Sequence, residues 1–417
     1  MSWPSVKPPW KHVKWQSWSP QIPWSVPAKP EFSILLSFPD MSGSLYMLKH
    51  QIEELDSKCE WEFLKRTSNP YELVFSQSQD PRILPSICSL RPLSRSFFKM
   101  IEILSVLDFF KRHGSARKNI IRSAHVCEGP GGFIEALLYL SSKNSYTLEK
   151  AWAMTLKPTK TNIPGWKRAY YFLKKSPMIQ IEYGADDTGD IMVPENQATF
   201  LEKARGKCQI FTADGGFDFS EHYGTQEEEV FPLLVSSALI GLQTMVKGGD
   251  FILKVFDTEL ESTRDLIAIL ACCFDSWTLY KPGLSRPCNA EKYFLGKSCR
   301  SIPYWILDLL TNIQMSYKSG ITRLIRIFPS IPLTIMNDIE TLKKEYLDQQ
   351  VAALNYAISH KKQWNDNPEE IWKDIYKYSV LWCRQFQMPI KAFAGPFIFP
   401  HQVEASHMNL KDAVQPE

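Results

Sequence analysis

The sequence of 417 residues lacks the features that mark membrane, secreted and zinc-binding proteins. It contains no run of about 18 apolar residues, the minimum for a membrane-spanning helix. Its N-terminus has no apolar core of a secretory signal. Its nine cysteines form no C-x-x-C pair and have no companion histidines, which argues against a disulfide framework and against a zinc site. We therefore expect a soluble protein of a reducing, intracellular compartment.

The sequence also has little net charge. Its 48 basic and 45 acidic residues leave a net charge of +3, which is too small to mark a nucleic-acid-binding protein by its overall field. Any contact with nucleic acid must come from a local basic surface. The length allows one large α/β domain with flanking elements, or two small domains.

Tryptophan and proline are concentrated at the N-terminus, where residues 1–30 hold five tryptophans and seven prolines. Prolines at this frequency exclude a helix or a central strand and predict an extended arm. The tryptophans are expected to pin this arm across the body of the protein; the alternative is a stacking surface for bases. Residues 31–110 have a mixed, largely helical pattern, which includes predicted helices at 47–64 and 94–110.

From residue 120 onward, strands and helices alternate in a pattern typical of a doubly wound, mostly parallel sheet with helices on both faces. The predicted strands are 120–127, 150–156, 179–183, 208–213, 250–256, 277–281 and 293–297. The predicted helices between them are 132–140, 195–204, 226–246 and 261–273. After residue 300 this alternation stops, and the pattern predicts two amphipathic helices, 341–359 and 368–386. The organisation expected from these patterns is a lead-in at 1–60, a sheet domain at 61–300 and a helical extension at 301–417.

A glycine turn, Cys-Glu-Gly-Pro-Gly-Gly-Phe at 127–133, joins the first predicted strand to the helix that follows. Glycines there let the backbone approach a ligand closely, and the N-terminus of the helix supplies free N–H groups. No Gly-Lys-Ser/Thr follows, so the turn is not a P-loop, and it is not a complete G-x-G-x-x-G fingerprint. Taken alone, it is either a cofactor site or a tight structural turn.

Charged residues occur at the expected carboxyl ends of other strands. Asp214 follows a predicted strand and precedes two glycines, in the place where open α/β sheets bind ligands. Lys254 lies within an apolar strand, where it either reaches solvent from an edge or is paired. Glu291 ends a loop that begins at Lys281. Upstream, Lys99 lies on a predicted helix that could cover the same edge of the sheet.

Together these residues resemble the FtsJ-like ribose 2′-O-methyltransferases, whose active site is a Lys-Asp-Lys-Glu tetrad. The tetrad here would be Lys99, Asp214, Lys254 and Glu291. The flanking sequences are most similar to those of the cap-specific mRNA enzymes of eukaryotes and viruses: Asn-Pro-Tyr-Glu at 69–72, Met-Thr-Leu-Lys at 154–157, Gly-Asp-Ile at 189–191, and Ser-Arg-Pro at 285–287 with Glu-Lys-Tyr at 291–293. The resemblance covers roughly residues 60–300.

Three positions depart from the pattern of the family. Glu128 stands where relatives often have alanine, Ser94 stands where some have asparagine, and Asp187 lies in a segment that is often glycine-rich. None of them removes a member of the tetrad, so we expect a catalytically active protein.

The resemblance implies a Rossmann-like fold with a seven-stranded, mostly parallel sheet, and places the methyltransferase domain at 61–300. It also implies S-adenosyl-L-methionine as cofactor, no metal, and methylation of the ribose of the first or second transcribed nucleotide of capped mRNA. The implied partner is the m7G-capped 5′ end of mRNA, together with capping or transcription machinery, and not DNA or a membrane. The implied location is the nucleus, or the cytoplasm for a viral enzyme.

The resemblance further implies two sets of binding residues. The cofactor-binding residues would be Ser94, Cys127, Gly129, Pro130, Gly131, Gly132, Phe133, Asp190, Ile191 and Asp214. The substrate-binding residues would be Lys65, Arg66, Arg95, Tyr223, Gly224, Thr225, Ser285 and Arg286. In the tetrad, Lys254 would act as the base or orient the ribose hydroxyl, and the neighbouring cation Lys99, with partial burial, is expected to lower its pKa.

Three alternatives differ from this reading. A ribose methyltransferase of ribosomal or transfer RNA would share the tetrad, and activity on uncapped structured RNA would favour it. A catalytically idle cap- or RNA-binding subunit would share the fold, but the intact tetrad argues against it. A dehydrogenase would need an acidic residue for the ribose after the second strand, where the sequence has Thr155, Leu156 and Lys157.

Overall fold

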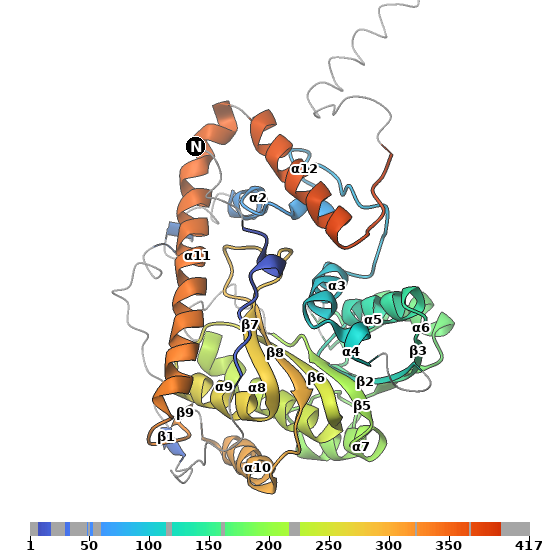
Figure 1. Cartoon of the computed structure of the whole chain (residues 1–417), viewed down its shortest axis with the longest axis vertical. Coiled ribbons are helices and arrows are strands. Elements are labelled where there is room, and N and C mark those ends of the chain that lie inside the picture. The colour runs from blue at the N-terminus through green and yellow to red at the C-terminus, as the bar shows by residue number, and fades with distance from the viewer. Residues whose placement is uncertain are drawn as a thin grey trace, which may run out of the picture.

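A seven-stranded sheet lies at the centre of the computed structural model (Figure 1). Its strands, in spatial order, are β4 (Ile179–Glu182), β3 (Thr147–Met154), β2 (Ile120–Val126), β5 (Cys208–Ala213), β6 (Met245–Val255), β8 (Lys292–Cys299) and β7 (Phe274–Tyr280). Strand β8 runs antiparallel to both of its neighbours, and the other paired strands are parallel. This confirms the mostly parallel sheet that the sequence predicts.

The structure describes residues 7–17, 30–33, 48, 51–52, 60–113, 119–159, 163–216, 226–321, 323–366 and 368–392.

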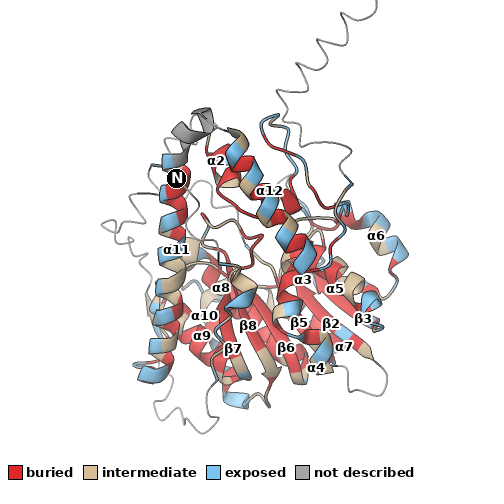
Figure 2. Ribbon diagram, turned by 45° about the horizontal axis from the view of Figure 1, so that its top comes forward, coloured by how far each residue is buried: buried red, intermediate tan, exposed pale blue. Residues whose placement is uncertain are grey.

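Helices cover both faces of the sheet because its strands are apolar on both sides. One face packs against α3 (Ser96–Val106) and α5 (Gly132–Lys143). The other face packs against the four helices α7 (Pro194–Ala204), α8 (Gln226–Thr244), α9 (Glu261–Cys272) and α10 (Tyr304–Lys318). Figure 2 shows the buried residues concentrated in the strands and in the inner sides of these helices. Four further short helices are α4 (Phe109–His113), α6 (Tyr170–Lys175), η1 (Pro9–Lys11) and η3 (Lys167–Ala169).

Two boundaries differ from the sequence prediction. The helix expected to continue to residue 246 ends at Thr244, and β6 begins at Met245, well before the expected residue 250. Met245 is paired with Cys208 of β5. Local sequence does not decide between helix and strand for a short apolar stretch, and here the pairing with the neighbouring strand decides it.

The region after residue 300 contains more structure than expected. Helix α10 was not predicted, although Ile306, Leu309, Leu310 and Ile313 recur at helical spacing and are buried. Helix α11 (Leu333–Asp366) is longer than the predicted 341–359, whereas α12 (Pro368–Gln385) has nearly the predicted bounds. Within the described residues no helix is long and apolar enough to cross a membrane.

The two ends of the described chain pack onto the sheet domain. Strand β1 (Glu31–Ser33) pairs with β9 (Arg323–Arg326), and Gln16 pairs with Trp277 of β7. The ring of Trp10 lies 5.5 Å from that of Tyr71, so the described part of the arm lies against the protein body as expected. Trp3, Trp18 and Trp24, and most of the helix expected at 47–64, lie outside the described residues; within that range α2 (Trp61–Thr67) begins.

Candidate active site

The topology of the sheet brings the four residues of the proposed tetrad to one edge. Asp214 directly follows β5, whose last residue pairs with Leu253 of β6. Lys254 is paired with Tyr293 of β8, and Glu291 directly precedes that strand. Lys99 comes from α3, which packs against α5 above the same sheet edge.

The four side chains form a chain of alternating charge. The Nζ atom of Lys99 donates a hydrogen bond to Oε1 of Glu291 at 2.6 Å. The Nζ atom of Lys254 lies 3.1 Å from Oδ1 of Asp214 and 4.0 Å from Oε2 of Glu291. Their side chains are between 11% and 15% exposed, which leaves each group accessible to a substrate but largely desolvated. Ion pairs in such a setting hold their members in fixed positions.

Tyr293 is a fifth member of this cluster that the sequence reading did not assign to the site. Its hydroxyl donates a hydrogen bond to Oδ1 of Asp214 at 2.8 Å, and its side chain is fully buried. Burial, followed by the nearby carboxylates of Asp214 and Glu291, raises the pKa of Tyr293, so that it remains a donor. Its place opposite Lys254 in the antiparallel register is the signal that could have identified it.

The electrostatics of Lys254 contradict the expected lowering of its pKa. Burial does favour the neutral amine, but the carboxylates of Asp214 and Glu291 outweigh burial, and the pKa of Lys254 is raised. Burial likewise opposes ionisation of Glu291, yet Lys99 and Lys254 hold its pKa well below the ordinary value. The prediction was wrong because it gave the second lysine more weight than the two carboxylates, Asp214 and Glu291, that lie close to the Lys254 amine.

The glycine turn has a conformation that few other residues could adopt. Gly131 has a φ of +104° and precedes the first residue of α5, and a Cβ atom on Gly129 would lie 2.6 Å from the carbonyl oxygen of Gly165. A Cβ atom on Gly132 would lie 2.9 Å from the backbone nitrogen of Phe97, so Gly132 allows α3 and α5 to meet. The first backbone N–H groups of α5 have no carbonyl partner within the helix, so they can donate hydrogen bonds to a ligand at this turn.

Ser94, Pro130 and Phe133 support this turn. The hydroxyls of Ser94 and Ser96 are 2.5 Å apart and lie beside Gly132. Pro130 follows a cis peptide bond, and Phe133 is buried with its ring 5.8 Å from that of Tyr293. Phe133 of the turn therefore packs against Tyr293, which in turn bonds Asp214 of the tetrad.

Cys127 lies between the turn, the loop of Asp214 and a third segment that contains Asp190. Burial, then the charges of Asp190 and Glu128, raise the pKa of the Cys127 thiol to about 12. A Cβ atom on Gly215, the residue after Asp214, would lie 3.1 Å from Cβ of Cys127. Cys127 is thus close to Asp190 and to the loop of Asp214, next to the tetrad.

Asp190 and Ile191 have different surroundings. Oδ1 of Asp190 accepts a hydrogen bond from the backbone nitrogen of Met192 at 2.8 Å, which stabilises its turn. The amide of the buried Asn196 donates to the carbonyl oxygen of Asp190 at 2.9 Å and fixes the same turn. The side chain of Ile191 lies in the hydrophobic core, 1% exposed.

The buried Glu128 has polar neighbours. Its carboxylate accepts a hydrogen bond from Thr212 and lies 3.3 Å from Nδ1 of His125. His125 in turn lies 2.7 Å from the hydroxyl of Ser123. Burial raises the pKa of Glu128 despite these partners. Glu128 therefore forms a buried polar cluster with Thr212 and His125 at the glycine turn.

The arginines predicted to bind substrate converge on a buried carboxylate, Glu72 of the Asn-Pro-Tyr-Glu motif. Oε1 of Glu72 lies 2.6 Å from Arg95, 2.9 Å from Arg286 and 3.6 Å from Arg66. The amide of Asn69 donates to Oε2 at 2.9 Å. Burial opposes ionisation of Glu72, but these partners lower its pKa. The motif thus joins the short helix η2 (Glu72–Val74), α3 and the loop before β8.

The other residues predicted to bind substrate are more dispersed. Arg66 lines a shallow surface hollow with Gln77, Ser78 and Gln79, and Lys65 pairs with the exposed Glu62. Tyr223, Gly224 and Thr225 lie outside the described residues. Among the described residues, no cluster of three or more His, Cys, Asp and Glu side chains is arranged to hold a metal ion.

The loop 281–291, which carries Ser285, is braced from within by Lys281. Its Nζ atom donates to the carbonyl oxygens of Asn289 and Glu291, at 2.7 and 2.8 Å, and lies 3.4 Å from Oγ of Ser285. Burial lowers the pKa of Lys281 to about 7. The sequence gives no sign of this role because the partners of Lys281, Ser285, Asn289 and Glu291, are brought to it only by the fold of the loop.

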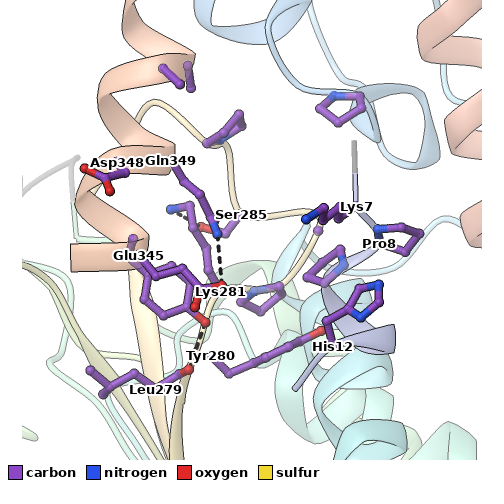
Figure 3. Close-up of a pocket in the computed structure, with 18 of the residues that line it drawn as sticks. Lys7, Pro8, His12, Leu279, Tyr280, Lys281, Ser285, Glu345, Asp348 and Gln349 are labelled. Atoms are coloured by element: carbon purple, nitrogen blue, oxygen red, sulfur yellow. Dashed lines mark hydrogen bonds between the residues drawn. The ribbon is translucent and has the colours of Figure 1, made fainter. Parts of the chain in front are cut away.

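A cavity of about 530 Å³ lies on one side of this loop. Figure 3 shows Lys281 and Ser285 between the arm residues Lys7 and His12 and the α11 residue Glu345. The same loop thus lines this cavity and contributes Glu291 to the tetrad.

The seven-stranded, mostly parallel sheet with helices on both faces is typical of the S-adenosylmethionine-dependent methyltransferase fold. Residues 92–299 match the model of the FtsJ-like methyltransferase family, and the chain therefore contains an FtsJ-like methyltransferase domain. The use of S-adenosylmethionine follows from membership of this family.

Two relatives carry names that describe cap methylation. The chain is 30% identical over 284 residues to the cap-specific mRNA (nucleoside-2′-O-)-methyltransferase 1 of Xenopus laevis, covering 64% of this chain and 31% of the relative. It is 28% identical over 312 residues to the cap-specific mRNA (nucleoside-2′-O-)-methyltransferase 2 of Danio rerio, covering 72% of this chain and 41% of the relative. The chain thus spans less than half the length of these relatives.

A solved structure of a protein described as a ribosomal RNA methyltransferase of Plasmodium falciparum is similar to part of the chain. It is 18% identical, with a TM-score of 0.34, and the match covers 49% of this chain and 97% of that one.

Proposed function

We propose that the protein transfers a methyl group from S-adenosylmethionine to a ribose 2′-hydroxyl of capped mRNA, at the first or second transcribed nucleotide. The observation that carries this proposal is the convergence of Lys99, Asp214, Lys254 and Glu291 at one sheet edge, beside the glycine turn. The names of the relatives support the capped substrate.

The residues around the turn fit the cofactor. Free N–H groups at the start of α5 suit a carboxylate or hydroxyl acceptor, and Asp190 provides a carboxylate close to Cys127. We assign Gly129 and Asp190, with the rest of the turn, to cofactor binding. S-adenosylmethionine would supply the methyl group on a positively charged sulfur, so the reaction needs no metal.

The proposed role of Lys254 follows from its charge. In the proposed transfer the ribose oxygen bonds to the methyl carbon as the methyl–sulfur bond breaks, which would leave a neutral thioether, and the hydroxyl proton passes to water. The oxygen becomes more negative as that proton leaves, and an ammonium group held in place can stabilise the charge. Because Asp214 and Glu291 raise the pKa of Lys254, its amine is protonated in the free enzyme and is placed to orient and stabilise the attacking oxygen. Lys99 holds Glu291, and Tyr293 holds Asp214, in the positions that this role requires.

The RNA would approach from the side of Arg66. We assign Arg66 and Lys65 to contacts with the cap or its phosphates, because both lie on α2 at the surface beside the hollow. Arg95 and Arg286 would act by fixing Glu72 and the loop 281–291, with their outer surface available to phosphate. Partners in the capping or transcription machinery and a nuclear location belong to the same proposal.

Transfer of labelled methyl to matched capped and uncapped short RNAs tests this function. Cap-dependent incorporation that Lys254→Ala abolishes is the expected result. Lys247→Ala, an exposed lysine on the same strand, is the matched control and should retain activity. Equal labelling of uncapped RNA would instead favour a ribosomal or transfer RNA methyltransferase. Absence of cofactor binding would overturn the enzyme assignment and leave an RNA-binding subunit.

A further inference from the structure

A second buried carboxylate, Glu102, lies on α3 three residues after Lys99. Its side chain is fully buried, and burial raises its pKa to about 7 despite three hydrogen-bond donors. Its hydrogen-bond partners among the described residues are Tyr280, Gly283 and Trp382, none of which belongs to the tetrad. A carboxylate in such a position is costly unless its hydrogen bonds are complete, so the groups that donate to it are held strongly.

The three donors come from separate parts of the chain. The indole nitrogen of Trp382 on α12 donates to Oε2 of Glu102 at 2.6 Å. The hydroxyl of Tyr280, at the end of β7, donates to Oε1. The backbone nitrogen of Gly283, in the loop 281–291, donates to the same oxygen at 2.9 Å. Glu102 therefore connects α3, the loop and a C-terminal helix that lies outside residues 92–299.

These bonds complete a closed path through the proposed active site. Gly283 lies near the start of the loop 281–291, and Lys281 joins that start to the carbonyl oxygen of Glu291 at 2.8 Å. The carboxylate of Glu291 then bonds Lys99, which lies on the same helix as Glu102. A displacement of the loop at Gly283 must therefore change the position of Glu291 relative to Lys99, because each step of the path is a direct contact.

We propose that Glu102 and Trp382 are positioning residues for methyl transfer, and that α12 holds the loop 281–291 in the geometry that aligns Glu291 with the two lysines. This inference rests on the proposed function. It makes the C-terminal helix part of the machinery of the site, although it contributes no group that touches the reactants.

Trp382→Phe is the most direct test. Phenylalanine preserves an aromatic ring between Phe98 and Phe386, whose centroids lie 5.8 and 4.7 Å from that of Trp382, but removes the indole donor. We expect kcat to fall about tenfold, which corresponds to the loss of one hydrogen bond to a buried carboxylate. The KM values for cofactor and RNA should stay within about twofold of wild type. Trp372→Phe, a buried tryptophan of the same helix, is the control for loosened packing and should retain kcat.

Hydrogen exchange separates failure of this inference from failure of the proposed function. In the free, full-length protein, Trp382→Phe should speed exchange of the amides in 281–291, whereas Trp372→Phe should not. This readout needs no substrate, so it remains informative if the wild-type protein methylates no RNA. Unchanged exchange and unchanged kcat in Trp382→Phe would overturn the positioning role.

A double-mutant cycle with Glu102→Gln tests whether the two residues act through one bond. Glutamine has the same shape but lacks the charge, and we expect it also to lower kcat and to speed exchange in the loop. If Trp382 acts through Glu102, the double variant should be no worse than Glu102→Gln alone. Losses of kcat that multiply would show that the two residues act independently and would contradict the proposal.

Discussion

The two sides of the candidate site are built differently. On the cofactor side, the glycine turn and Asp214 follow the adjacent strands β2 and β5, so ordinary strand pairing places them together. On the loop side, buried carboxylates join distant segments, as Glu72 joins Arg286 and Glu102 joins Trp382. The cofactor side thus depends on backbone geometry and the loop side on long-range polar contacts. Substitutions should accordingly affect cofactor binding on one side and alignment or stability on the other.

Lys254→Ala should cause the largest change. We expect kcat to fall by about 10²- to 10³-fold, because a preorganised charge next to the attacking oxygen is lost. Affinity for S-adenosylmethionine, measured by calorimetry, should change little. A variant with near wild-type kcat would contradict the proposed role of Lys254. Loss of cofactor binding would instead show that Lys254 also contributes to the cofactor side of the site.

Glu72→Gln should mainly destabilise the loop side. Removing this carboxylate leaves Arg95 and Arg286 partly buried without their charge partner, and we expect a loss of about 3 kcal/mol in the free energy of unfolding. Denaturant unfolding measures this change. Glu62→Gln, whose 57% exposed side chain pairs with Lys65, is the control and should cost less than about 1 kcal/mol. Equal effects would show that the Glu72 network contributes little.

The pH dependence of stability should identify Glu102. Its pKa in the folded protein is about 7, above the ordinary 4.5, so the folded state binds the proton more tightly. Glu102 therefore stabilises the fold below about pH 4.5, and this contribution is lost as the pH rises through 7. Relative to Glu102→Gln, wild-type stability should fall by about 2–3 kcal/mol across that interval, measured by unfolding at several pH values. Parallel pH profiles would show that the carboxyl is not perturbed.

Gly132→Ala should act on the cofactor side. The added methyl group would press against the backbone of Phe97 and separate α3 from α5, so we expect about 1–3 kcal/mol of destabilisation and weaker cofactor binding. Ser142→Ala, at an exposed position of α5, is the control. Wild-type cofactor affinity in Gly132→Ala would show that the packing of the turn does not shape this site.

The sequence predicted the cofactor side better than the loop side. The period of apolar residues located the seven strands, and the position of Asp214 after β5 followed from topology alone. Tyr293 was missed because it reads as an ordinary core residue of a strand. The sign of the Lys254 pKa shift was wrong because it depends on distances to two carboxylates, which no sequence pattern contains.

The loop side could not be derived because its partners are remote in sequence. Glu102 and Trp382 are 280 residues apart, and neither carries a local signal beyond a place on an amphipathic helix. The bond between Arg286 and Glu72 likewise joins residues that are 214 positions apart. Helix α10, by contrast, has a clear apolar period and could have been found from the sequence.

Identification of the methylated atom tests the central claim most directly. Capped RNA would be incubated with the full-length protein and labelled S-adenosylmethionine, digested to nucleosides and analysed by mass spectrometry. We expect a 2′-O-methylated nucleoside from the cap-proximal position, which is absent when Lys254→Ala replaces the wild-type protein. A methyl group on a base, or a ribose methyl that persists in Lys254→Ala, would contradict it.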